Sequence, residues 1–268
     1  PDGDFDMEQL AEQLQDGPTS LVSVMRVQNE TGWIFPVPEI AQLRDELAPG
    51  VPLHCDATQA FCKMPVNPRE WGVQLLTAGA HKIGGPRGIG ILYVQRGLPM
   101  HTTAFGGNQE RGLRSGTEPV FLAVGMAEAV RITAAHMETD MEYAASLRER
   151  AIEGLKREIP DAVVHAPEGG SPYILSVSVP GLPNAVSVKY LSGRRVCVSR
   201  ASACEENHTT VAPGTWRPKH PLALQAAGIP LREGKETLRA SFFHRNTPED
   251  VDRFVAVLAQ CAREMRES

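Results

Sequence analysis

The stretch A-G-A-H-K at residues 78–82, followed by I-G-G-P-R-G-I-G-I-L-Y-V at residues 83–94, places one lysine between two apolar runs. The first run fits a buried strand, and the glycine-rich turn after Lys82 leads into another strand. Lys82 therefore follows the carboxyl end of a strand, where an apolar surround favours the neutral amine over the ammonium. Such a lysine is suited to form a Schiff base, and an ordinary surface lysine in a loop is the alternative.

Strands and helices alternate around this stretch. The predicted elements are strands at 19–27, 51–55, 73–78 and 89–94 and a helix at 39–48. This alternation is typical of a doubly wound α/β layer with a mainly parallel sheet, whose ligands bind beyond the carboxyl ends of the strands. Asp56 follows the second of these strands, and its carboxylate there suits a pyridinium nitrogen that must stay protonated. A turn or helix-capping role is the alternative for Asp56.

The second half of the chain predicts a smaller α+β domain. The sequence from Thr117 to about Glu158 has helical composition but is too long for one globular helix, so we expect a break near 137–140. The predicted domains are therefore 1–138 and 139–268. Thr247 and Pro248 mark the start of the last helix. Short β-rich runs are predicted at 162–165, 173–179, 195–199 and 237–243.

Charge and composition exclude several classes of protein. The chain has 27 basic and 32 acidic side chains and a formal charge of −5, without a basic stripe, so direct nucleic-acid binding is not expected. It has no apolar run of about 18 residues, and its first residues are acidic, so we expect neither a membrane span nor a signal peptide but a cytoplasmic protein. The five cysteines include no C-x-x-C pair, which argues against a disulfide framework or a zinc site.

Five blocks, in order, resemble the pyridoxal-phosphate-dependent cysteine desulfurase family, within the fold that also contains the class V aminotransferases. The blocks are V-S-V-M-R-V-Q-N-E-T-G at 22–32, H-C-D-A-T-Q at 54–59, H-K-I-G-G-P-R-G-I-G at 81–90, F-G-G-N-Q-E-R-G-L-R-S-G-T at 105–117 and S-R-A-S-A-C at 199–204. The resemblance implies fold type I, with a mainly parallel sheet in a large domain and a smaller C-terminal α+β domain. It also implies that the large domain is incomplete, because family members carry a further N-terminal third.

The resemblance assigns cofactor-binding roles for pyridoxal 5'-phosphate. Lys82 would be the Schiff-base lysine, and Asp56 the partner of the pyridine nitrogen. Gln59 and Asn29 would lie near the ring oxygen of the cofactor. His81 would contact the phosphate region.

The resemblance also assigns one residue to the cofactor site of the second subunit and others to substrate binding and sulfur transfer. Thr117 would reach the phosphate of the other subunit's cofactor, which implies a homodimer with shared sites. Arg239, with Asn29, would bind the substrate carboxylate, since an arginine fork makes a bidentate pair. Cys204 lies among small residues before a polar stretch, so an exposed nucleophilic thiol is expected there.

The implied reaction converts L-cysteine to L-alanine, with the sulfur held as a persulfide on Cys204 and passed to an acceptor protein. The acceptor would serve iron–sulfur assembly, tRNA thiolation or DNA phosphorothioation. Two alternatives remain open: a selenocysteine or C–S lyase that uses the same cofactor, and an inactive scaffold subunit. Of the other cysteines, Cys55, Cys197 and Cys261 are predicted in the core, and Cys62 is left unassigned.

Overall fold

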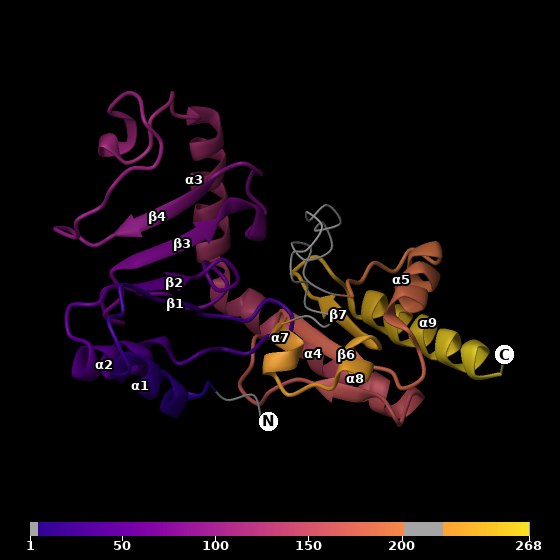
Figure 1. Ribbon diagram of the computed structural model, residues 1–268. Helices are drawn as coiled ribbons and strands as arrows, with labels where there is room; N and C mark the ends of the chain where they lie inside the picture. Colours follow the sequence, from indigo (N-terminus) through magenta and orange to yellow (C-terminus); the bar gives the residue numbers. More distant parts are fainter. Residues whose placement is uncertain (1–4, 201–221, 268) are drawn as a thin grey trace, which may run out of the picture. The chain divides into compact units, whose positions relative to one another are not determined.

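The computed structural model describes residues 5–200 and 222–267 (Figure 1). The chain divides into two compact units, each built around its own sheet. The four-stranded unit comprises Asp6–Arg26 and Pro36–Met137. The three-stranded unit comprises Pro1–Phe5, Val27–Phe35 and Glu138–Ser268. The segment Val27–Phe35 therefore groups with the residues from Glu138 onward. A single division at residue 138 would assign this segment to the other unit.

The four-stranded unit contains the predicted α/β layer. Its elements are α1 (Met7–Gln15), β1 (Val22–Met25), α2 (Val37–Leu47), β2 (Leu53–Asp56), β3 (Leu75–Gly79), the 3₁₀ helix η1 (Ala80–Lys82), β4 (Gly90–Val94), the 3₁₀ helix η2 (Gln109–Gly112) and α3 (Val120–Ala135). The strand order is β1-β2-β3-β4, and β1, β2 and β3 are parallel (Figure 1). Because parallel strands end at the same edge, residues that follow β2 and β3 lie on one side of the sheet.

Strand β4 runs antiparallel to β3, which lets the lysine turn connect the two as a hairpin. The pairing is close at Gly90, where an added Cβ would lie 2.7 Å from the carbonyl oxygen of Ala78. Any larger residue at this position would push the strands apart. The outer side of β4 is exposed, and the side chains of Ile91 and Leu92 are 39% and 49% accessible.

Local sequence signals mark the boundaries of α1 and α2. The predicted helix at 39–48 is present as α2, which begins two residues earlier at Val37, beside two prolines, and ends at Leu47. Helix α1 was not predicted, although Asp6 accepts a hydrogen bond from the backbone N–H of Gln9, as an N-cap residue does. Strand β1 is shorter than predicted, and Ser23 on it is exposed, so it is not buried on both faces.

The predicted break in the long helical stretch is present. Helix α3 ends at Ala135, and α4 (Met137–Glu158) follows after one residue. Within the described residues, no single helix is long and apolar enough to cross a membrane; α3 and α4 meet that criterion only when they are joined across their break.

The three-stranded unit has an antiparallel sheet. Besides α4, its elements are β5 (Val163–His165), β6 (Ile174–Ser178), α5 (Asn184–Gly193), α7 (Leu222–Ala226), α8 (Leu231–Gly234), β7 (Thr237–Ser241) and α9 (Pro248–Arg266). The strand order is β5-β6-β7, and every residue of the central strand β6 is buried. Helix α9 begins with the predicted Thr247 N-cap, which forms a reciprocal capping box with Asp250.

One predicted strand in this unit is wrong. Residues 195–199 form no strand, and only Ser199 makes an isolated bridge to Arg239 of β7. Val196 and Val198 favour β structure by propensity, but the preceding helix α5 ends at Gly193 and the backbone turns at Arg195, whose φ is +60°.

Candidate functional site

Lys82 is the last residue of η1, directly beyond the carboxyl end of β3. Helix α3 lies against the turn after it: the hydroxyl oxygen of Thr133 is 3.3 Å from the carbonyl oxygen of Ile83 and 2.8 Å from that of Ala129 in its own helix. The backbone N–H of Gly85 donates a hydrogen bond of 2.9 Å to the carbonyl oxygen of Ala80. Lys82 is half-buried, so its side chain is partly shielded from water and still accessible.

Asp56 is the last residue of β2 and pairs in register with Thr77 of β3. One carboxylate oxygen, Oδ1, accepts a hydrogen bond of 2.8 Å from the backbone N–H of Thr58. The turn role that the sequence left open therefore applies to this oxygen. Because a carboxylate has two oxygens and about four lone pairs, this turn does not exhaust its capacity to accept hydrogen bonds.

Gln59 lies in the turn that follows Asp56, and this turn is tied to the next strand. The backbone N–H of Ala57 donates to the carbonyl of Thr77 over 2.8 Å. The side-chain oxygen of Gln59 accepts a hydrogen bond of 3.4 Å from the ammonium of Lys63. Burial and the positive charge of Lys82 lower the pKa of Lys63 to about 8.

His81 is exposed, and its ring lies against the backbone at Gly79. A Cβ added at Gly79 would meet the imidazole ring at 3.0 Å. Glycine at this position therefore leaves room for the histidine ring beside the strand end. Thr117, in the loop between η2 and α3, is also exposed.

Asn29 and Arg239 belong to the three-stranded unit. The guanidinium of Arg239 donates from Nη1 to the backbone carbonyl of Asn29 over 2.9 Å. The backbone of Arg239 also exchanges two hydrogen bonds with Ser199, of 2.7 and 3.0 Å. The two residues predicted at the substrate carboxylate are therefore neighbours, although Asn29 offers its backbone oxygen here and not its amide.

Cys204, the predicted nucleophile, lies outside the described residues. Of the cysteines predicted in the core, Cys55 and Cys261 are buried. Burial raises the pKa of Cys55 to about 12, as expected for an inert core thiol. The prediction for Cys197 is wrong: it is exposed, because the strand expected around it does not form.

In each unit, one residue that contacts or positions a predicted site residue was missed. Gln28 is 7% exposed, and its side-chain oxygen accepts the backbone N–H groups of Glu30 and Thr31, which fixes the turn that contains Asn29. Lys63 follows Gln59 by four residues, and the turn between them brings their side chains together. That spacing is readable from sequence, whereas the burial of Gln28 is not.

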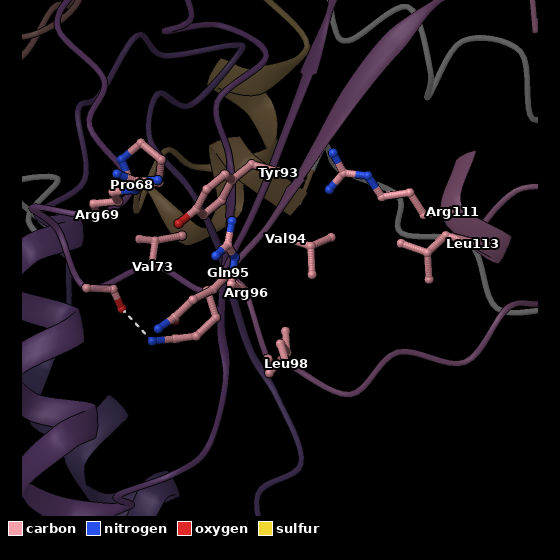
Figure 2. A pocket seen from close by; sticks show the side chains of 13 residues that line it. Pro68, Arg69, Val73, Tyr93, Val94, Gln95, Arg96, Leu98, Arg111 and Leu113 are labelled. Atoms are coloured by element: carbon pink, nitrogen blue, oxygen red, sulfur yellow. Dashed lines mark hydrogen bonds between the residues drawn. The ribbon is translucent and has the colours of Figure 1, made fainter. Parts of the chain in front are cut away.

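A hollow of about 710 Å³ lies at the other end of β3 and β4 (Figure 2). Residues around it include Arg69, Tyr93, Arg96 and Arg111. None of the predicted site residues lines it. Among the described residues, no group of three or more His, Cys, Asp and Glu side chains is arranged to hold a metal ion.

The donor set of the four-stranded unit fits pyridoxal phosphate. Lys82 supplies an amine for the aldehyde of the cofactor. Asp56 supplies a carboxylate for the ring nitrogen, and Gln59 an amide for the ring oxygen. The three follow neighbouring parallel strands, the usual place for a ligand in such a sheet. The fold is that of fold-type I proteins, and these residues form a candidate site for pyridoxal phosphate.

Comparison with known proteins agrees with this class. A family model described as aminotransferase class-V matches residues 1–254, and the chain belongs to that family. Its members depend on pyridoxal phosphate. A relative described as a cysteine desulfurase, from Nostoc sp., is 33% identical over 266 residues, which cover 98% of this chain and 63% of the relative.

Solved structures give the same result. A NifS-like protein matches with a TM-score of 0.81 at 31% identity, over 93% of this chain and 64% of the other. A structure described as SspA in complex with cysteine matches with a TM-score of 0.69 at 25% identity, over 92% of this chain and 65% of the other. The chain thus spans somewhat under two thirds of the length of each of these three proteins.

Proposed function

We propose that the protein is a cysteine desulfurase that converts L-cysteine to L-alanine and transfers the sulfur to an acceptor. The observation that carries the proposal is the grouping of Asp56, Gln59 and Lys82 after neighbouring parallel strands. The relatives described as cysteine desulfurases and the cysteine complex of SspA support L-cysteine as the substrate.

Pyridoxal phosphate, when bound, supplies an electron sink that makes the Cα–H bond of an amino acid acidic. Lys82 would hold the cofactor and, as a free amine, remove the Cα proton of the substrate. Asp56 would keep the ring nitrogen protonated. Arg239 would orient the substrate through its carboxylate by a bidentate pair.

The sulfur-transfer step would fall to Cys204. Its thiolate attacks the sulfur of the substrate, so that an S–S bond forms and the C–S bond breaks. The electron pair of the broken bond stays with the carbon, which takes up a proton and becomes the methyl group of alanine. The outer sulfur of the persulfide would then pass to an acceptor protein. We further propose a homodimer, in which Thr117 reaches the partner subunit's site.

The first experiment is a visible absorption spectrum of the purified chain titrated with pyridoxal phosphate, beside Lys82→Ala. The wild type should develop a saturable visible band that makes the solution yellow, and the variant should not, because the band requires a Schiff base with this lysine. Lys156→Ala, at an exposed lysine of α4, is the matched control for loss of a lysine that takes no part in the site. A wild-type spectrum equal to that of Lys82→Ala contradicts the proposal.

A second experiment separates desulfurase from lyase. Alanine and sulfide are measured after addition of L-cysteine to the wild type and to Cys204→Ser, with Cys197→Ser as the matched control. Loss of alanine production in Cys204→Ser alone supports a persulfide on Cys204. Unchanged alanine production in that variant rejects the persulfide step.

A further inference from the structure

Lys63 forms a small cluster with Gln59 and Lys82 in the four-stranded unit. Its ammonium lies 3.4 Å from the side-chain oxygen of Gln59. The turn that carries both residues is closed by backbone hydrogen bonds from Phe61 to Ala57 over 2.7 Å and from Lys63 to Ala60 over 2.9 Å. The side chain of Lys63 is therefore held beside Gln59 by the local backbone.

The residue before Lys63 adopts an unusual backbone conformation. Cys62 has a φ of +55°, in the left-handed region that residues with a Cβ rarely occupy. Such conformations cost free energy and persist where the surrounding structure imposes them, often at functional sites. The strained turn sets the direction in which the chain reaches Lys63, and it lies directly after Asp56 and Gln59.

The contact decides how the amide of Gln59 is oriented. A lysine ammonium has only donors, so the atom of Gln59 that faces it must be the oxygen, the only acceptor of the amide. The NH₂ group of Gln59 is then the part left to interact with another molecule. An NH₂ group donates hydrogen bonds, and the ring oxygen of pyridoxal phosphate accepts them when it is negatively charged.

We infer that Lys63 is a positioning residue, which fixes the amide of Gln59 as a hydrogen-bond donor toward the ring oxygen of the cofactor. The inference rests on the proposed function, because it assigns Gln59 to that oxygen. Lys63 does not itself touch the substrate in this scheme. Its effect on the cofactor passes through Gln59.

The charge around Lys63 supports the inference. Burial, and then the nearby positive charge of Lys82 on η1, disfavour a charge on Lys63, so the pKa of Lys63 falls to about 8. The carboxylate of Asp56 begins the same turn. A half-buried amine near another positive charge is unfavourable unless it makes a compensating contact, and Gln59 provides one such contact.

The test uses the full chain titrated with pyridoxal phosphate, as wild type, Lys63→Met and Lys63→Arg. Methionine keeps the length of the side chain without a donor, and arginine keeps the donor and the charge. Lys63→Met should bind the cofactor about fivefold more weakly, the size expected for one lost hydrogen bond. The pH midpoint of its visible band should rise by about half a unit, because a donor no longer stabilises the negative ring oxygen. Lys63→Arg should restore both values.

A double-mutant cycle with Gln59→Leu separates positioning from structural support. In the Gln59→Leu background, Lys63→Met should have no further effect on the midpoint, since the amide that it orients is gone. A loss of thermal stability in Lys63→Met, with the wild-type midpoint and affinity retained, overturns the inference. So does a midpoint shift of the same size in both backgrounds.

Failure of the inference and failure of the proposed function give different results. If the wild type forms no visible band, both are rejected, because Gln59 then has no cofactor to contact. If the wild-type band forms and is lost in Lys82→Ala, but the Lys63 variants titrate like the wild type, only the role of Lys63 is rejected.

Discussion

Arg44 should be replaceable by methionine at a smaller cost than by lysine. Its side chain is 2% exposed on α2, and its guanidinium donates to three oxygens at the start of the sheet. The acceptors are the carbonyl of Val51, the side chain of Gln74 at 2.8 Å and the carbonyl of Gly72 at 3.0 Å. A planar fork of donors can reach all three, whereas an ammonium on a flexible stem cannot.

The magnitude follows from what each substitution leaves behind. In Arg44→Met, Gln74 still accepts from the backbone of Leu53 and still donates to Gly72, so the carbonyl of Val51 is the group left without its donor. One unsatisfied buried acceptor costs about 1–3 kcal/mol. In Arg44→Lys a charge stays buried with fewer partners, which costs about 3–5 kcal/mol.

Urea denaturation followed by far-UV circular dichroism measures both free energies of unfolding. The expected order of stability is wild type, Arg44→Met, Arg44→Lys. Arg44→Ala serves as a control for packing, and should be less stable than Arg44→Met because it also removes the alkyl stem and leaves a cavity. A lysine variant as stable as the wild type, or more stable than the methionine variant, would refute the reasoning.

Three further predictions concern single contacts. Thr247→Ala should destabilise the chain by about 1 kcal/mol in urea denaturation and Thr247→Ser by much less, because serine keeps the capping hydroxyl of α9. Burial lowers the pKa of His165, and the nearby Glu233 offsets part of this, so the unfolded chain takes up the proton more readily. The neutral ring of His165 contributes fully to the free energy of unfolding above pH 6.5, the pKa of histidine in the unfolded chain. This contribution is lost as the pH falls below that value through the lower pKa of the folded chain. A His165→Gln variant whose stability has the same pH dependence as the wild type would contradict this. In thiol labelling of the native chain, Cys197→Ser should lose one fast-reacting group and Cys55→Ser none, since Cys55 is buried with a pKa of about 12.

Much of the candidate site was readable from local sequence. The glycine-rich turn predicted Lys82 at a strand end, and Asp56 was expected after a neighbouring strand; both lie there in the structure. These predictions depend on apolar runs and turn residues, which act over a few positions of the chain. Helix α9 was predicted for the same reason, from its capping residues.

Contacts between distant residues were not readable in this way. The pairing of Arg239 with the carbonyl of Asn29 joins positions 210 residues apart. The grouping of Val27–Phe35 with the three-stranded unit also depends on such contacts, for example the hydrogen bond of 2.7 Å from the N–H of Ser171 to the carbonyl of Gly32. No periodicity or capping signal specifies which distant groups will meet.

The sequence by itself determined where most strands and helices lie and which residue types follow the strands, because hydrophobic period, capping and turn chemistry are local. Tertiary structure alone decided burial and partners. It exposed Cys197, buried Arg44 among backbone oxygens and placed the charge of Lys63 near Lys82. The physical reason is that burial, hydrogen-bond satisfaction and charge interaction depend on what lies nearby in space, which the packing of the whole unit determines.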